Sequence, residues 1–292
     1  MATIHSLLVG TDFSGAARQA VLRAARLAAE LGVERARVAH ALERSVLRTL
    51  SEKMARQPAP DEEVYQKVAE ALDALVAGMR EETGASMEPV VLEGRATDAI
   101  AKAAAADDLL VVGARGSGGV RDFAIGSTAQ RVVYRAGVPV LVVRTEPTEG
   151  YRNVLAATDF SDSALRALKF VPAVAPRAAL HVANVYQGPY EANMIHAGVS
   201  DALINDYRDK VGQDSRMMMT QLLHDAGLDK DGVSCISEPG YPPRKLLEIA
   251  RDRKADLLVV VKHGLSDFGD ALLGGVAWHL LAEAPCDVLV VQ

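Results

Sequence analysis

The 292-residue sequence is poor in cysteine and in aromatic residues. It has only two cysteines, Cys235 and Cys286, too few for a disulfide framework and typical of a reducing compartment. Aromatic residues make up 4% of the chain, so its core must be largely aliphatic. No apolar run approaches the roughly 18 residues that a membrane-spanning helix needs, and the first residues lack the basic segment of a secretory signal. These absences predict a cytoplasmic protein with no membrane partner.

Basic residues are also in deficit. The 32 Lys and Arg residues are outnumbered by 38 Asp and Glu, which gives a formal net charge of -6. Nonspecific nucleic-acid binding requires a basic surface, so a nucleic-acid partner is not expected. The seven histidines and two cysteines show no metal-ligand spacing, and we therefore predict no zinc site made by the protein.

The sequence contains an internal repeat. The tetrapeptide TDFS at 11–14 recurs at 158–161, and the pentapeptide DLLVV at 108–112 recurs at 256–260. The separation of the two copies is 147 residues at the first motif (158 minus 11) and 148 at the second (256 minus 108). Such a fixed period indicates a duplicated structural unit.

The boundary between the copies lies in a stretch that contains Pro147 and Gly150, which are common in linkers. We therefore predict a first domain at residues 1–146 and a second at residues 152–292. In the first copy, short apolar runs predict strands near residues 4–10, 36–42, 86–92, 108–113 and 138–143. The continuous Val and Leu runs among them are typical of parallel strands buried on both faces.

Helical patterns occupy the intervals between the predicted strands. The stripe of small apolar residues from Ala17 to Leu31 predicts a helix that ends at Gly32. In the second copy, a stripe predicts a helix whose apolar face consists of Leu203, Tyr207, Val211, Met218 and Leu222. Strands that alternate with helices predict, for each copy, an open five-stranded parallel sheet with helices on both faces. Such α/β sheets bind ligands beyond the carboxyl ends of their strands.

A glycine-rich loop follows the fourth predicted strand. Gly113 and Gly116 are followed, after nine residues, by Gly126 and Ser127, and a helical pattern then begins. Glycines allow close approach to a phosphate and positive φ angles, while the free N–H groups of a helix start favour an anion. The chain has no G-x-x-x-x-G-K-[ST] motif, and Arg121 interrupts a dinucleotide-type G-x-G-x-x-G. A pyrophosphatase-type S-G-G loop is a weak match, because it follows the fourth strand rather than the first.

The four loop positions reproduce the G-x2-G-x9-G-[ST] signature of the universal stress protein family. The DFS turn at 12–14 and the VPVLVV ending at 138–143 are also similar to that family. The resemblance covers both copies, so the chain resembles a tandem, two-domain member. It implies a Rossmann-like nucleotide-binding fold with strand order 3-2-1-4-5, and ATP, accompanied by Mg²⁺ or Mn²⁺, as the ligand. In this strand order Cys235 and Cys286 lie at opposite edges, so no disulfide is expected between them.

The resemblance also implies roles for individual residues. Asp12 would contact the adenine, and Ala41 would line it through its backbone. The first two glycines and Arg115 would contact the ribose and phosphates, and the helix start would hold the outer phosphates. The complete predicted ATP-binding set is Thr11, Asp12, Ala41, Val112, Gly113, Arg115, Gly116, Gly126, Ser127 and Thr128. A competing interpretation of Asp12, and the favoured one for Asp159, is that the carboxylate only caps the following helix.

The second copy departs from the loop signature. Val261 stands where the first copy has Gly113, and Gly275 replaces Ser127. A branched Cβ would block close backbone approach to a ligand. Residues 113–127 carry two basic and one acidic residue, net +1, whereas residues 261–275 carry one basic and two acidic, net -1. We therefore predict one ATP site per chain, in the first domain, and a degenerate loop in the second.

Three classes of function follow. The favoured one is an ATP-binding stress-response or signalling protein with at most slow hydrolysis, because the loop offers no strong candidate for a catalytic base. The alternatives are an ATPase or phosphotransferase, and an assembly module that binds no nucleotide. Hydrophobic fifth strands invite edge pairing, and the family pairs domains through that edge. An intrachain pseudo-dimer is therefore expected, with a homodimer of the chain as a further partner.

Overall fold

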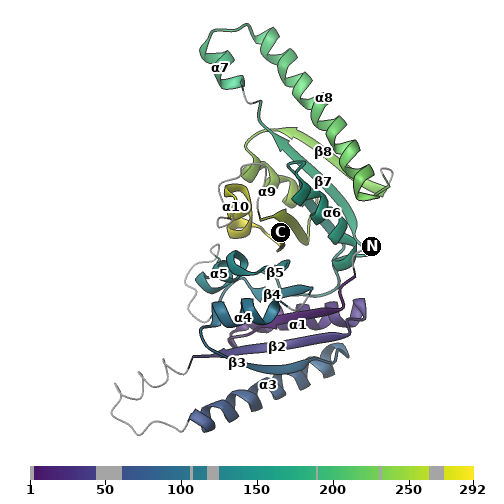
Figure 1. Cartoon of the computed structure of the whole chain (residues 1–292). Coiled ribbons are helices and arrows are strands. Elements are labelled where there is room, and N and C mark those ends of the chain that lie inside the picture. The colour runs from purple at the N-terminus through teal and green to yellow at the C-terminus, as the bar shows by residue number, and fades with distance from the viewer. Residues whose placement is uncertain are drawn as a thin grey trace. The chain divides into compact units, whose positions relative to one another are not determined.

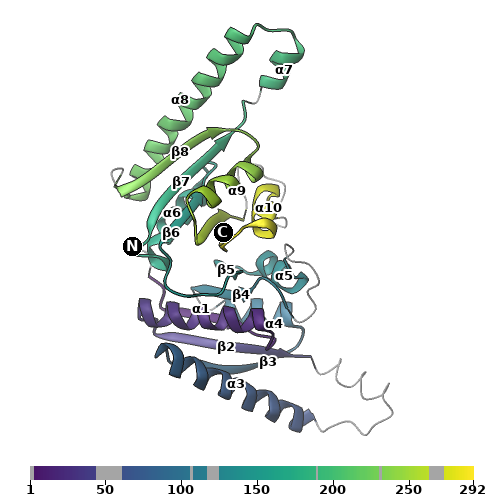
Figure 2. The same ribbon diagram turned by 180° about the vertical axis from the view of Figure 1, so that it is seen from behind.

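The computed structural model describes residues 3–43, 61–105, 108–116, 125–188, 190–229, 232–262 and 273–292 (Figures 1 and 2). The chain forms two compact units, Thr3–Gly150 and Tyr151–Gln292. Each unit contains five strands in its described residues, and all the pairings within a unit are parallel. The α/β fold predicted from the alternation of strands and helices is confirmed.

The first unit alternates strands and helices. Its elements are β1 (Ser6–Gly10), α1 (Gly15–Leu31), β2 (Arg35–Leu42), α3 (Asp61–Thr83), β3 (Glu88–Glu93), α4 (Ala96–Ala104), β4 (Leu109–Gly113), α5 (Ser127–Arg135) and β5 (Val140–Val143). The strand order β3-β2-β1-β4-β5 confirms the predicted topology. Helix α1 packs beside α3, and α4 packs beside α5, so helices cover both faces of the sheet.

The second unit repeats this plan with one additional short helix. Its elements are β6 (Asn153–Ala157), α6 (Asp162–Val174), β7 (Ala179–Tyr186), α7 (Glu191–His196), α8 (Asp201–Ala226), β8 (Val233–Pro239), α9 (Pro242–Asp252), β9 (Leu257–Val261), α10 (Gly275–Glu283) and β10 (Asp287–Val291). Its strands run in the order β8-β7-β6-β9-β10. Cys235 lies in β8 and Cys286 immediately precedes β10, at the two ends of this strand order, and the two cysteines form no disulfide.

Aliphatic side chains on the central strands form the core of each unit. Leu7 and Leu8 in β1, and their counterparts Val154 and Leu155 in β6, have no exposed surface. Helix α1 ends where the sequence predicts, because Gly32 adopts a left-handed conformation with a φ of 65°. This conformation closes the helix at little cost for a residue without a Cβ.

The buried face of α8 matches the prediction only in part. Leu222 is buried as predicted, but Leu203 and Met218 are 54% and 48% exposed, and their neighbours Ile204 and Met219 are buried instead. This face also makes polar contacts: the buried Ser215 hydroxyl donates to the Asn184 side-chain oxygen at 2.8 Å and lies 2.5 Å from the Ser237 hydroxyl. The apolar pattern used for the prediction gave no weight to a buried serine.

An aspartate before the fourth strand of each sheet fixes the start of the first strand. The Asp108 carboxylate accepts hydrogen bonds from the backbone N–H groups of His5 and Ser6, at 2.8 and 2.9 Å, and from the Ser6 hydroxyl at 3.2 Å. Asp256 accepts from the N–H groups of Arg152 and Asn153 at 2.7 and 3.0 Å. Burial raises the pKa of Asp108, but the hydrogen bonds from His5 and Ser6 outweigh it and leave this pKa below its ordinary value.

Replacing Asp108 with asparagine is expected to lower the free energy of unfolding by about 1–3 kcal/mol at neutral pH, because the three hydrogen bonds then have a neutral acceptor instead of a charged one. The lowered pKa in the folded state means that the carboxylate stabilises the fold above its unfolded pKa, about 3.9. This stabilisation is lost as the pH falls through the folded pKa, so the variant and the parent should converge in acid. Urea unfolding followed by circular dichroism at several pH values measures the difference. Glu34→Gln, at an exposed ion pair with His5, is the control and should change little.

Candidate functional site

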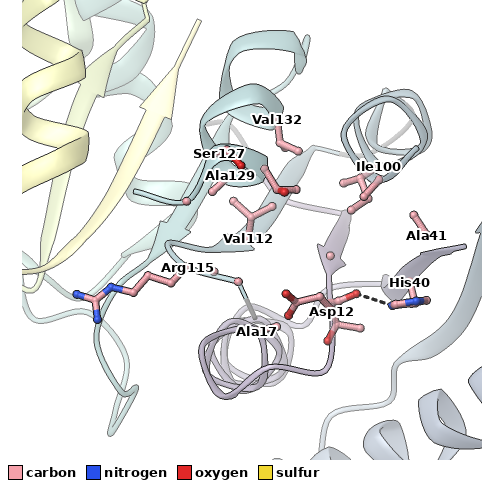
Figure 3. Close-up of a pocket in the computed structure, with 17 residues that line it drawn as sticks. Asp12, Ala17, His40, Ala41, Ile100, Val112, Arg115, Ser127, Ala129 and Val132 are labelled. Atoms are coloured by element: carbon pink, nitrogen blue, oxygen red, sulfur yellow. Dashed lines mark hydrogen bonds between the residues drawn. The ribbon is translucent and has the colours of Figure 1, made fainter. Parts of the chain in front are cut away.

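A cavity of about 410 Å³ lies beyond the carboxyl ends of β1 and β4 in the first unit (Figure 3). At this place the chain leaves neighbouring strands toward opposite faces of the sheet, which opens a crevice. All the residues of the predicted ATP-binding set line this one cavity. The residues that line it in addition to that set are Gly10, Ala17, His40, Ala96, Ile100, Ala129 and Val132. Its volume falls within the range of small-molecule sites, roughly 300–1,000 Å³.

The turn after β1 positions Asp12 at the cavity. Phe13 has a φ of 62°, unusual for a residue with a side chain, and its N–H donates to the Thr11 hydroxyl at 3.1 Å. The N–H of Ser14 donates to Asp12 Oδ1 at 3.0 Å. The N-cap of α1 is Ser14, whose Oγ accepts from the N–H of Ala17 at 3.2 Å. The interpretation of Asp12 as a helix cap is therefore wrong.

The second unit repeats this turn. Phe160 has a φ of 65°, and Ser161 caps α6. Asp159 Oδ1 accepts hydrogen bonds from the N–H and the hydroxyl of Ser161 at 3.1 and 2.6 Å. The prediction that Asp159 is the cap of its helix is also wrong, because a serine two residues later takes that position in both units. In each turn, one oxygen of the aspartate carboxylate accepts a hydrogen bond from the backbone N–H of the capping serine.

His40, near the end of β2, lines the cavity although it was not predicted as a site residue. Its Nδ1 donates to the carbonyl oxygen of Thr11 at 2.9 Å, the dashed line in Figure 3. Because a carbonyl only accepts, this nitrogen carries the proton. The imidazole also packs on the ring of Phe13, with the centroids 4.8 Å apart. The one available signal was its position immediately before Ala41, because a single histidine on a strand has no motif of its own.

The opposite end of the cavity is formed by the start of α5. Gly126 is the N-cap of this helix, has no side chain to cap it, and donates its N–H to the carbonyl of Ala114 at 2.7 Å. The next N–H groups, of Ser127 and Thr128, belong to the first turn, where a helix supplies no acceptors. The side chains of both residues are exposed. Amide groups, hydroxyls and the helix dipole together provide donors for an anion at this end.

The glycines of the loop serve packing as well as access. A Cβ on Gly113 would lie 2.9 Å from the carbonyl oxygen of Ala16, so this glycine permits the close approach of α1 to β4. A Cβ on Gly116 would lie 2.8 Å from Asp12 Oδ2. Neither these glycines nor Gly126 has a positive φ, so the expectation that the loop glycines are needed for that conformation is wrong for all three.

Arg115 lines the cavity, but its side chain points away from Asp12 and Ser127, toward the left of Figure 3. Two other charged residues of the predicted loop, Arg121 and Asp122, lie outside the described residues. Within the described ranges, no group of three or more His, Cys, Asp or Glu residues is placed to hold a metal ion. No helix in the same ranges is long and apolar enough to cross a membrane.

The second unit has a corresponding cavity of about 330 Å³. Its lining residues are Ala157, Thr158, Asp159, Asn184, Val185, Pro242, Leu246, Val260, Val261, Gly274, Gly275, Val276, Ala277 and Leu280. Equivalent hydrogen bonds fix the correspondence: the N–H of Thr11 donates to Ala39, and that of Thr158 donates to Ala183, both at 2.9 Å. The aligned glycine at position 264 lies outside the part of the chain that the structure describes.

Both copies of the repeat resemble known proteins. A sequence model of the Universal stress protein family matches residues 3–144 and again residues 150–292. The chain is 33% identical over 148 residues to Universal stress protein Rv1636 of Mycobacterium tuberculosis, which covers 49% of this chain and 97% of the relative. It is 28% identical over 145 residues to Universal stress protein MJ0531 of Methanocaldococcus jannaschii, covering 49% of the chain and 82% of that protein.

A crystal structure of a universal stress protein from Archaeoglobus fulgidus has the same fold. It superimposes with a TM-score of 0.67 at 21% identity, and the match covers 100% of this chain and 99% of that one. Matches of the family model to both halves, together with the repeated sheet topology, account for nearly the whole sequence. The chain belongs to the universal stress protein family and carries two copies of its domain in tandem.

Proposed function

We propose that the first unit binds ATP, together with Mg²⁺ or Mn²⁺, and that the protein acts as a nucleotide-dependent stress-response protein. The observation that supports this proposal is the composition of a single cavity. Apolar walls, one carboxylate and an uncapped helix start converge on it from separate elements. This combination suits a ligand with a planar apolar end and an anionic end.

The base would lie against the apolar walls. Ile100 comes from α4, Val112 from the end of β4 and Val132 from α5, and Figure 3 shows them around the same space. Asp12 lies at the edge of these walls, and its carboxylate can only accept hydrogen bonds at neutral pH. An exocyclic amino group or a ribose hydroxyl is a matching donor. Adenine has such an amino group, which supports an adenine nucleotide.

The phosphates would lie at the start of α5. The N–H groups of Ser127 and Thr128 and their hydroxyls supply donors, and the helix dipole favours negative charge there. A divalent ion would offset the remaining phosphate charge, in the manner usual for ATP, through phosphate oxygens and water rather than through a protein cage. No residue of this chain is assigned as its ligand.

Binding is favoured over hydrolysis by the placement of ionisable groups. Of the described residues that line the cavity, only Asp12, His40 and Arg115 have ionisable side chains. Asp12 and His40 lie at the turn after β1 and at the end of β2, whereas the phosphate donors lie on α5 (Figure 3). A base that activates water must reach the outer phosphate. We therefore assign no catalytic residue and expect slow hydrolysis at most.

Equilibrium dialysis of the purified chain against labelled ATP with Mg²⁺ tests the proposal. We expect one ATP per chain and about tenfold weaker binding in Gly116→Ala, because the new Cβ displaces the Asp12 carboxylate 2.8 Å away. The side chain of Asp12 can rotate, so stability should change little. Gly15→Ala is the matched control, since a Cβ there meets nothing within 4 Å. Absence of ATP binding, or equal affinities in the two variants, would refute this assignment.

A further inference from the structure

The cavity of the second unit resembles the first on the side proposed for the base and differs from it on the side proposed for the phosphates. Its base-side walls have residues of the same kind: Leu246, Val260 and Leu280 stand where the first unit has Ile100, Val112 and Val132. Thr158 and Asp159 repeat Thr11 and Asp12, with the same hydrogen-bonded turn. A planar apolar group with a donor at its edge therefore meets equivalent surroundings in both units.

The phosphate side is altered at two adjacent positions. Gly275 and Val276 begin α10, where α5 begins with Ser127 and Thr128. Both hydroxyl donors are therefore absent, and Val276 places an apolar side chain, 38% exposed, at the start of the helix. Of the described residues at this end, only backbone N–H groups would face a phosphoryl group, and Val276 would desolvate it. Hydrogen bonds to charged groups are stronger than those between neutral groups, so the two losses disfavour a phosphate here.

The base side of the two cavities carries the same charge. Of the described residues that line the second cavity, Asp159 alone has a charged side chain, and it repeats Asp12 of the first cavity, where the Arg115 side chain points away. Such a carboxylate favours a neutral donor, such as an amino group or a ribose hydroxyl. The Asn184 side chain, which takes the place of His40, is neutral. Its Nδ2 donates to the carbonyl of Thr158 at 2.8 Å, and its oxygen accepts from Ser215.

We propose that the second cavity binds an adenine compound without phosphate, of which adenosine is the representative, while the first binds ATP. This inference rests on the proposed function only for the choice of adenine as the base. The apolar walls hold the base, Asp159 accepts from its amino group or from the ribose, and the altered start of α10 excludes the phosphorylated forms.

The test measures binding of labelled adenosine to the full chain in the presence of saturating Mg²⁺ and ATP. We expect one adenosine per chain that ATP does not displace. Asp159→Asn should weaken it at least tenfold, because asparagine keeps the Oδ1 that holds Ser161 but replaces the second acceptor oxygen with a donor. Asp12→Asn is the matched variant in the first unit and should keep this adenosine while it weakens ATP.

Three outcomes overturn the inference. They are adenosine that ATP displaces completely, adenosine binding that Asp159→Asn leaves unchanged, and two ATP molecules per chain. The result also separates this inference from the proposed function. A chain that binds no ATP, but binds adenosine in a manner sensitive to Asp159→Asn, refutes ATP binding in the first unit and supports the second site. Trp278 in α10, the single tryptophan of the chain, provides a local fluorescence signal for the second unit.

Discussion

Replacing Ser127 with glycine and Thr128 with valine is expected to weaken ATP binding about 100-fold or more and to change adenosine binding in the first unit by less than about threefold. The variant gives α5 the first two residues of α10. Two hydroxyl donors to a charged phosphate are lost, each contributing about 1.5–3 kcal/mol, and 1.4 kcal/mol corresponds to a factor of ten. The apolar walls and Asp12, which we propose as the contacts of the base, are unchanged.

Isothermal titration with Mg-ATP and with adenosine measures the two affinities, in chains that also carry Asp159→Asn so that the second cavity adds little adenosine binding. Gln130→Ala is the control, because Gln130 is exposed on the same helix and does not line the cavity. Circular dichroism should show equal folding of parent, control and double variant. Equal losses of ATP and adenosine affinity would mean that the start of α5 does not face the phosphates. Unchanged ATP affinity would place the nucleotide elsewhere.

The sequence predicts the fold well because the fold depends on local periodicity. Continuous Val and Leu runs predict strands buried on both faces, and these runs occur in both copies of the repeat. The predicted site residues come together for a topological reason. Parallel strands end at one edge of the sheet, so the motif after β1 and the loop after β4 must meet there. The whole predicted set therefore lines one cavity, at the edge where the parallel strands end.

Features that depend on tertiary partners were not predictable in this way. His40 lies at the cavity and is held there by a hydrogen bond to the carbonyl of Thr11, and no sequence motif predicts this contact. The buried face of α8 includes Ser215, which donates to Asn184, and a pattern of apolar residues gives such a serine no weight. The sequence of the second copy indicates the loss of one hydroxyl, at Gly275. The structure adds the second loss, at Val276, because it shows both residues at the start of α10 beside the cavity.

The role of Gly113 also depends on a tertiary partner. The sequence suggests that this glycine lets a phosphate approach the loop, whereas in the structure it lets helix α1 pack closely against β4. A Cβ at this position would lie 2.9 Å from the carbonyl oxygen and 3.0 Å from the carbonyl carbon of Ala16. Backbone atoms of a buried helix cannot rotate away, so α1 would have to shift as a whole.

Gly113→Val is therefore expected to lower the free energy of unfolding of the first unit by about 2–3 kcal/mol, the upper range for overpacking. Because Gly113 and Ala17 both line the cavity, the shift of α1 should also abolish measurable ATP binding. The second unit already has valine at this position, Val261, so its α6 must leave room for the side chain. The reverse change, Val261→Gly, should destabilise that unit by about 1 kcal/mol through lost packing and greater freedom of the unfolded chain.

Two optical probes distinguish the units during urea unfolding. Trp278 lies in α10, so its fluorescence follows the second unit, whereas far-ultraviolet circular dichroism follows both. Gly113→Val should shift part of the dichroism transition and leave the fluorescence midpoint in place, and Val261→Gly should shift the fluorescence midpoint. If Gly113→Val unfolds at the parent midpoint by both probes and retains ATP, then α1 tolerates a side chain at this contact. In that case the glycine is required neither for packing nor for the ligand, and the difference between the two loops has no energetic basis at this position.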